Sequence, residues 1–557
     1  MNDLDKDLSK KFLNYLDTKQ YQRLQFEADM LGNIEEQHPV LIFYYASAIY
    51  LQETAKEKDL LYSSSLFEKV YNLSNNHLQS LYNMIAVSFK TKVFKNVLRL
   101  TLKAYEKNPN DKMLIEGLAR IHFYLGNRSE SIKLFRMLYK SEPNKTEGRL
   151  PFISSLNYTS GISQKEYMEE CLNYAALVEK KLDIENDNYE FNNKKNDLIR
   201  IGFLSADFKN HSVSHFLKDI LNNIDKSKFN VNLISNLAVS EKDKFSDVMK
   251  ELSNNWYDVE HYSDKELTIF LRSLNLDILI DLSGFTQGNR FEVFARRCAK
   301  IQMVWLGYNN SLGIKNSDYL ISDKNLVYED ELNSYKEQII FLPEIWNALS
   351  RPENLPEIDN FKDKNSNLTF CSFNNFQKLS DRTINVWSRI LKETNAKILL
   401  KDSLTGGDDL KENVLNKFLK QGVKENQIIF LKREKNNEDH INLYNKANVA
   451  LDTFPYPGVT TSCEAILMGL PVLTMKGFNF NSRCGESILI NSNLKNLVAK
   501  NKDDYVSKVV SFADDLDTLE QVRKFIFAEI LKTNTFNTKK FAANFWKSIL
   551  DTYTNHK

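Results

Sequence analysis

From Ile201 onward, short runs of β-branched and apolar residues alternate with helical stretches, and this alternation constrains the fold more than any other feature. The first runs cover 201–205, 231–235, 277–281, 301–305 and 319–322. After a polar stretch at 350–367, further runs follow at 368–372, 397–400, 428–431, 449–452 and 471–474. Strands separated by helices form βαβ units with a parallel sheet. We therefore predict two doubly wound α/β lobes joined by a linker, with ligands bound at the carboxyl ends of the strands.

The first 185 residues have a different character, because they read as helix after helix with almost no strand-like runs. Asn108-Pro109-Asn110 has a counterpart in Glu142-Pro143-Asn144, so the two prolines are 34 residues apart. A 34-residue period of paired helices is typical of tetratricopeptide repeats, in which each unit buries its apolar face only against a neighbour. We predict an α-helical tetratricopeptide-like repeat arm over residues 1–185, with an irregular helical bundle as the alternative.

Polar stretches set the predicted domain boundaries. Residues 183–197 (DIENDNYEFNNKKND) separate the arm from the α/β region. The prediction places the first Rossmann-like lobe at 196–348, the second at 366–535 and a C-terminal helix at 536–557.

The overall composition disfavours several classes of protein. Lys and Arg total 74 against 73 Asp and Glu, a formal net charge of +1, which gives no electrostatic case for a dedicated nucleic-acid binder. No stretch approaches the roughly 18 apolar residues of a membrane span, and the charged N-terminus lacks the apolar region of a signal peptide. The five cysteines are widely spaced without a CxxC pair, so neither a disulfide framework nor a structural zinc site is expected. Together these features predict a cytoplasmic protein.

A polar loop follows the first predicted strand of the first lobe and leads into a helix. It contains Asp207, His211 and His215, and the free N–H groups at the start of a helix suit an anion or a polar substrate. The two histidines are four residues apart, like a pair of metal ligands on one helical face, although no HExxH pattern or acidic cluster accompanies them. In another interpretation, Ser212 or Ser214 simply caps the helix.

The corresponding loop of the second lobe holds Lys378, between the strand at 368–372 and a helix that begins near Arg382. Ser380 or Asp381 is a good N-cap for that helix. A lysine just before a helix N-terminus is placed to meet a phosphate as a point charge. The alternative is an ordinary solvated lysine.

The strongest signal in the second lobe is the segment 451–464, LDTFPYPGVTTSCE. A rigid Pro/Gly loop follows the strand, and Thr460 and Thr461 begin a helix. Threonine hydroxyls and backbone amides at a helix N-terminus suit a diphosphate, and Glu464, one turn later, is placed to take both hydroxyls of a ribose. In the alternative, Glu464 is a capping-box residue that reaches back to Thr461.

Four ordered blocks, at 200–217, 277–308, 372–391 and 451–475, carry a family resemblance. The chain from about residue 198 to 531 resembles the catalytic region of the protein O-GlcNAc transferase family, which also contains the SPINDLY-type protein O-fucosyltransferases. The helical arm in front matches this family too. The resemblance implies a GT-B fold and metal-free, inverting transfer from a nucleotide sugar to Ser or Thr of a protein, with no cofactor.

The resemblance also implies roles for residues at the reacting centre. His211 matches the family's active-site histidine, and Lys378 matches its catalytic lysine on the donor diphosphate. Thr460 and Thr461 match the threonine pair on that diphosphate.

Further matches concern the nucleotide. Asn375 falls where a Gln or Asn contacts the donor, and His440 matches a histidine at the nucleotide site. Glu464 stands where GlcNAc enzymes carry Asp on the ribose and SPINDLY-type sequences carry Glu. Val459 replaces the histidine that stacks on uracil in the animal enzymes, and Asn309-Asn310 departs from the usual Tyr-Pro. These changes bear on the donor: UDP-GlcNAc is favoured, with GDP-fucose a close second.

Inverting transfer needs an acceptor hydroxyl opposite a diphosphate leaving group, and positive charge where that group develops. Lys378 and the predicted helix N-terminus supply this charge without a metal. The DxD triplets, Asp3-Leu-Asp5 and Asp515-Leu-Asp517, lie in polar helical stretches and do not suggest a metal site. Histidine is a common general base, so His211 is the first candidate and Asp207 the second.

The expected partners are a nucleotide sugar and protein acceptors bound by the repeat arm. Two alternatives remain: a GT-B transferase acting on a glycan or small molecule, and a non-catalytic repeat scaffold. The joint retention of five residues argues against the scaffold: His211, Lys378, Thr460, Thr461 and Glu464.

Overall fold

The computed structural model describes residues 3–187, 189–191, 197–352, 354–358, 368–401, 407–432, 434 and 436–556. The predicted boundaries at 196, 366 and 557 lie outside the described residues. The chain divides into two compact units: Met1–Lys145 with Leu404–Asn416, and Thr146–Ser403 with Lys417–Lys557.

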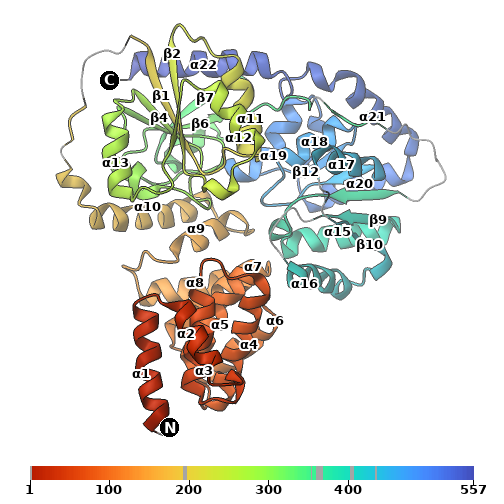
Figure 1. Ribbon diagram of the computed structural model, residues 1–557. Coiled ribbons are helices and arrows are strands. Elements are labelled where there is room, and N and C mark those ends of the chain that lie inside the picture. The colour runs from red at the N-terminus through yellow and green to blue at the C-terminus, as the bar shows by residue number, and fades with distance from the viewer. Residues whose placement is uncertain are drawn as a thin grey trace. The chain divides into compact units, whose positions relative to one another are not determined.

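The first unit is a stack of antiparallel helices (Figure 1). They are α1 (Asp3–Asp17), α2 (Tyr21–Asp29), α3 (Pro39–Leu51), α4 (Glu57–Leu73), α5 (Leu78–Thr91), α6 (Lys95–Lys107), α7 (Lys112–Tyr124) and α8 (Arg128–Ser141). α4, α6 and α8 end at intervals of 34 residues, which confirms the predicted helical repeat. Phe67, Leu81 and Leu114 are buried in a core that neighbouring helix pairs share.

Two helices at the start of the second unit, α9 (Arg149–Asn157) and α10 (Gln164–Lys181), lead into a seven-stranded parallel sheet of order β3-β2-β1-β4-β5-β6-β7. Its strands are β1 (Ile199–Ser205), β2 (Phe229–Ser235), β3 (Asn255–Asp258), β4 (Ile278–Asp281), β5 (Ile301–Val304), β6 (Tyr319–Asp323) and β7 (Gln338–Leu342). The helices α11 (Ser212–Asn222), α12 (Lys244–Leu252), α13 (Asp264–Ser273) and α14 (Phe291–Ala295) connect them.

A second parallel sheet has the order β10-β9-β8-β11-β12-β13. Its strands are β8 (Thr369–Ser372), β9 (Lys397–Leu400), β10 (Ile428–Phe430), β11 (Val449–Leu451), β12 (Val472–Met475) and β13 (Val498–Ala499). The helices with it are α15 (Asp381–Thr394), α17 (Asn437–Asn442), α18 (Thr460–Leu467), α19 (Phe480–Asn491), α20 (Lys502–Asp514) and α21 (Leu516–Glu529). Between α15 and α17 in the chain, α16 (Gly407–Lys420) belongs to the first unit up to residue 416. Both sheets reverse their strand order beside the first strand, at β1/β4 and β8/β11, where doubly wound folds bind ligands.

The α-helical arm followed by two Rossmann-like lobes is confirmed, and each strand-like run of the sequence overlaps a strand. The sequence analysis missed β3, β7 and β13. β3 is an edge strand whose side chains are exposed or half-buried, so its sequence NWYD lacks a buried pattern. β13 spans only two residues, Val498–Ala499.

The predicted C-terminal helix is α22 (Thr538–Asn555), and it packs on α11 and β7 of the first lobe (Figure 1). The indole Nε1 of Trp546 donates to the carbonyl of Ile220 at 3.0 Å. α9 and α10 are helical as predicted, but they belong to the compact unit that holds both sheets.

Candidate functional site

Lys378 lies in the loop after β8, at the carboxyl end of the first strand of its sheet. Its Nζ donates to the carbonyl of Pro457 at 2.9 Å and lies 4.3 Å from the centroid of the Tyr456 ring. Burial lowers the pKa of Lys378 to about 8, although the carboxylate of Asp452 acts in the opposite direction. The side chain is therefore half-buried and packed, not the solvated lysine of the alternative interpretation.

Asp452, which follows β11, organises the Pro/Gly loop. Its Oδ1 accepts the N–H of Gly458 at 2.6 Å and of Thr453 at 3.0 Å, and its Oδ2 accepts the hydroxyl of Thr474 at 2.8 Å. Burial raises the pKa of Asp452 to about 6, while these donors and the Lys378 amine lower it. The carboxyl thus holds the loop in shape and faces the lysine.

Thr460 and Thr461 are the first residues of α18, as predicted. The N-cap is Val459, whose side chain makes no capping hydrogen bond, so the first amides of the helix lack an intrahelical or side-chain acceptor. The hydroxyl of Thr461 donates to Oδ1 of Asn374 at 3.1 Å, which joins α18 to the loop after β8. Asn375, the predicted donor contact, caps a short turn by accepting the N–H of Gln377 at 2.9 Å.

Glu464 is not a capping-box residue, because its carboxylate takes part in a polar network. Its Oε2 accepts the hydroxyl of Tyr444 at 3.1 Å and lies 3.3 Å from Nε2 of His440. On the other side of the imidazole, the buried Lys401 amine donates to Nδ1 of His440. Since Nδ1 accepts, Nε2 carries the proton and donates to Glu464. The structure thus brings His440 into contact with Glu464, and both residues are predicted for the nucleotide site.

In the first lobe, His211 is itself the N-cap of α11, and its Nδ1 accepts the N–H of Val213 at 3.4 Å. The expectation that Ser212 or Ser214 caps this helix is therefore wrong: the histidine imidazole occupies the capping position. His211 Nδ1 lies 3.8 Å from Oδ2 of Asp207, so the two candidate bases are neighbours. Nε2 of His215 contacts Asn210 at 2.8 Å, so the two histidines make separate contacts.

A cavity of about 670 Å³ lies between the lobes. It is lined by His215, Lys218 and Phe245 of the first lobe, Arg351 of the linker, and Thr460 and Glu464 of the second. Burial lowers the pKa of His215, whereas the carboxylate of Glu464 across the cavity raises it. Thr460 and Glu464 therefore line the same cavity as His215 of α11 in the first lobe. Within the described residues, no hydrogen bond, ion pair or ring contact joins His211 or Asp207 directly to Lys378.

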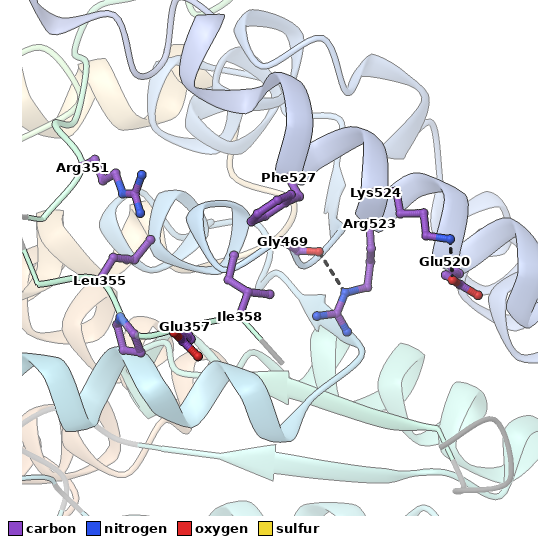
Figure 2. Close-up of a pocket in the computed structure, with 10 residues that line it drawn as sticks. Arg351, Leu355, Glu357, Ile358, Gly469, Glu520, Arg523, Lys524 and Phe527 are labelled. Atoms are coloured by element: carbon purple, nitrogen blue, oxygen red, sulfur yellow. Dashed lines mark hydrogen bonds and ion pairs between the residues drawn. The ribbon is translucent and has the colours of Figure 1, made fainter. Parts of the chain in front are cut away.

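A second cavity, of about 740 Å³, lies between the linker and α21 (Figure 2). Arg523 Nε donates to the carbonyl of Gly469 at 3.1 Å, and Lys524 pairs with Glu520 at 2.7 Å. None of the residues predicted for the site lines this cavity, although Arg351 borders both.

Other features of the described chain concern the remaining predictions. Asp515, in one of the DxD triplets, caps α21 by accepting the N–H of Thr518 at 3.0 Å. Within the described ranges, no three His, Cys, Asp or Glu side chains are grouped to hold a metal ion. All five cysteines are free and buried. Among the helices described, none is long and apolar enough to cross a membrane.

Sequence reasoning missed Asn374, Lys401 and Tyr444. Each contacts a predicted residue through the fold, over a separation of 87, 39 or 20 residues. Asn374 directly precedes the predicted Asn375, so the sequence pattern indicated the correct loop, the one after β8, but the neighbouring residue.

Two doubly wound parallel sheets that border one cleft, with a helix N-terminus and a lysine at the switch point of the second, define a GT-B glycosyltransferase fold. The model of glycosyl transferase family 41 matches residues 153–351 and 354–545. The chain therefore belongs to glycosyl transferase family 41.

The chain is similar to the probable UDP-N-acetylglucosamine–peptide N-acetylglucosaminyltransferase SPINDLY of Arabidopsis thaliana, with 31% identity over 360 residues. This alignment covers 63% of the chain but only 39% of the plant protein. The probable UDP-N-acetylglucosamine–peptide N-acetylglucosaminyltransferase SEC of the same plant is 25% identical over 370 residues, which are 64% of this chain and 37% of that protein. Among solved structures, an O-GlcNAc transferase mutant of Thermobaculum terrenum shares the fold, with a TM-score of 0.79, 23% identity and coverage of 93% of this chain and 98% of that one.

Proposed function

We propose that this protein is an inverting, metal-independent glycosyltransferase that moves a sugar from a nucleotide donor to Ser or Thr of protein acceptors. The observation that carries the proposal is the convergence of Lys378 and the N-terminus of α18 at the switch point of the second sheet. A half-buried ammonium and free helix amides stabilise a diphosphate as negative charge develops on it. Family membership and the plant relatives named as peptide glycosyltransferases support the same reaction.

In the proposed reaction, the acceptor oxygen bonds to the anomeric carbon as the bond to the diphosphate breaks. The electron pair goes to the diphosphate, which Lys378 and the amides at Thr460 and Thr461 bind. The acceptor proton goes to a base, for which His211 is the first candidate and its neighbour Asp207 the second. A single displacement of this kind inverts the anomeric configuration, which NMR of the product checks.

The nucleoside is proposed to lie in the cavity that Glu464 lines. The Glu464 carboxylate would take the ribose hydroxyls, because Tyr444 and His440 hold it in place. Asn375 is proposed to contact the donor nearby. No cofactor is needed in this scheme, since the protein itself meets the diphosphate charge.

Metal independence is tested by turnover in excess EDTA. We expect full activity, because Lys378 and the helix amides take the place of a cation. Activity that is lost in EDTA and restored by Mg²⁺ or Mn²⁺ would refute this part of the proposal.

The proposed donor is UDP-GlcNAc, the sugar nucleotide named for both plant relatives. GDP-fucose is the second candidate, because Val459 offers no aromatic surface to a pyrimidine and Glu464 matches the SPINDLY type. The higher identity to SPINDLY than to SEC points the same way. Calorimetric titration of UDP and GDP decides between them: GDP binding ~10-fold tighter, a difference of ~1.4 kcal/mol, would overturn the choice.

The acceptors are proposed to be proteins bound by the helical repeats of the first unit, whose stacked helices offer an extended surface. Mass spectrometry of the producing cell's proteome, with and without the gene, tests this. Sugar on free glycans or small molecules alone would favour the alternative transferase. Binding of partners without any donor turnover would favour a scaffold.

A further inference from the structure

The amine of Lys378 rests on an aromatic surface to which a distant segment contributes. Nζ lies 4.3 Å from the centroid of the Tyr456 ring. The same ring also contacts Tyr158, with ring centroids 4.7 Å apart and planes inclined by 50°. Tyr158 follows α9, on the turn that leads to α10, and so lies outside both sheets.

The turn that carries Tyr158 is fixed by its neighbour Asn157, which is only 5% exposed. The Asn157 side chain donates to the hydroxyl of Tyr308 at 2.9 Å and accepts from Nδ2 of Asn310 at 3.1 Å, both in the first lobe. Its carbonyl accepts from Asn481 of α19, in the second lobe, at 3.5 Å. Tyr158 is therefore presented by a turn that is tied to both lobes.

We propose that Tyr158 is a positioning residue for Lys378 and acts through the ring of Tyr456. The inference rests on the proposed function, which places Lys378 on the donor diphosphate. A lysine amine ends a flexible four-carbon stem, and a small misplacement of a reacting group costs a large factor in rate. The contact with Tyr158 holds the Tyr456 ring in place. A fixed Tyr456 ring restricts where the Lys378 amine can sit, because the ammonium is attracted to the face of that ring.

The surroundings of the amine indicate what removal of the Tyr158 ring would do. Besides Tyr456, the titratable groups that face Lys378 are Asp452 and Cys484, and both act to raise its pKa. Burial outweighs them and lowers the pKa of Lys378 to about 8. Burial also raises the pKa of Tyr456 well above its ordinary value, so the ring stays neutral. Opening the aromatic surface to water should therefore return the lysine toward its ordinary value.

The test replaces Tyr158 and measures Lys378 directly. Competitive acetylation across pH, read by mass spectrometry, reports the titration of each lysine without any donor. We expect a midpoint of about 8 for Lys378 in the wild type. The midpoint should rise by roughly half a unit or more in Tyr158→Leu and stay unchanged in Tyr158→Phe, because a phenyl ring makes the same tilted contact with Tyr456.

Steady-state kinetics then tests whether the position of the Lys378 amine affects kcat. With saturating donor, Tyr158→Leu should lower kcat about 10-fold with KM within about 3-fold, because the amine acts mainly in the transition state. Tyr158→Phe should restore kcat. Phe525→Leu, which removes an exposed aromatic ring of α21 outside the proposed donor and acceptor sites, serves as the matched control.

Two results would overturn the inference. One is a wild-type Lys378 midpoint near 10.5, which needs no variant. The other is a Tyr158→Leu protein that melts like the wild type with an unchanged midpoint and kcat. If the wild type turns over neither donor, the proposed function fails, while the acetylation result still decides whether Tyr158 shields the amine.

Discussion

In the proposed reaction, Lys378 needs its positive charge to stabilise the leaving diphosphate, and burial sets the pH at which that charge is lost. Its pKa is lowered to about 8, so the ammonium is present below pH 8 and lost above it. We expect kcat/KM to fall above pH 8, about tenfold per pH unit, because this ratio reports groups of the free enzyme. A profile that stays level to pH 10 would contradict the assignment.

A second prediction at the residue scale concerns the contribution of Glu464 to nucleotide affinity. Glu464→Gln keeps the shape of the side chain but removes the charge that faces the proposed ribose hydroxyls. We expect affinity for the nucleoside diphosphate to fall about 10-fold, since hydrogen bonds to a charged group are worth roughly 1.5–3 kcal/mol. Calorimetry measures this, with the exposed Glu425→Gln as control. Equal affinities would remove Glu464 from the site.

Most of the predicted site residues share one property: they belong to short segments that follow a strand. His440 is the exception, because it lies within α17 and is predicted only from the family resemblance. Lys378, Thr460 and Glu464 could be read in this way because strand–loop–helix order appears in the local sequence. Lys401 and Tyr158 could not, because each reaches the site through a contact that only the folded chain creates.

At the scale of elements, the N-terminus of α18 depends on the close packing of the Gly458 backbone against the first turn of that helix. A Cβ on Gly458 would lie 2.5 Å from Oγ of Ser462 and 2.6 Å from Oγ1 of Thr461. These hydroxyls can rotate, so we expect Gly458→Ala to fold with a loss of about 1 kcal/mol. Rotation of Thr461 away from the proposed diphosphate site should weaken nucleotide binding about 10-fold. Melting and calorimetry of the same variant check both parts, and unchanged affinity would exclude a role for this helix end.

Alternation of strands and helices in the sequence predicted the interior strands of both sheets. Interior strands of a parallel sheet are buried on both faces and read as continuous apolar runs. The edge strand β3 has partly exposed side chains and β13 spans two residues, so neither reads as a continuous apolar run in the sequence.

At the scale of the whole second unit, α19 ties the lobes together. Arg483 is 3% exposed and pairs with Glu331 of the first lobe, while Ser487 donates to Asp323 at 2.7 Å. The Glu331 side chain is 28% exposed, so water compensates part of the charge that Arg483→Met leaves unpaired. The loss in unfolding free energy should therefore be roughly 2 kcal/mol, between the values for buried and exposed pairs. Lys524→Met serves as the control, because Lys524 pairs with Glu520 on the exposed surface of α21. Its unfolding free energy should fall by less than about 1 kcal/mol. Equal unfolding free energies for the two variants would contradict this view of the interface.

The sequence predicted the number and kind of lobes but not how distant segments complete them. α22 packs on the first lobe through Trp546, and α9 and α10 belong to the second unit, which holds both sheets. Both facts depend on contacts between segments far apart in the chain, which hydrophobic periodicity cannot reveal.

The central claim is that this chain transfers sugar with Lys378 facing the leaving diphosphate. The most direct measurement is turnover of UDP-GlcNAc and GDP-fucose by purified wild-type and Lys378→Ala proteins of equal stability. We predict turnover of one donor by the wild type and a loss of at least ~10²-fold in kcat for the variant, because the charge acts mainly in the transition state. Equal kcat in the two proteins, or no turnover of either donor by the wild type, would contradict the claim.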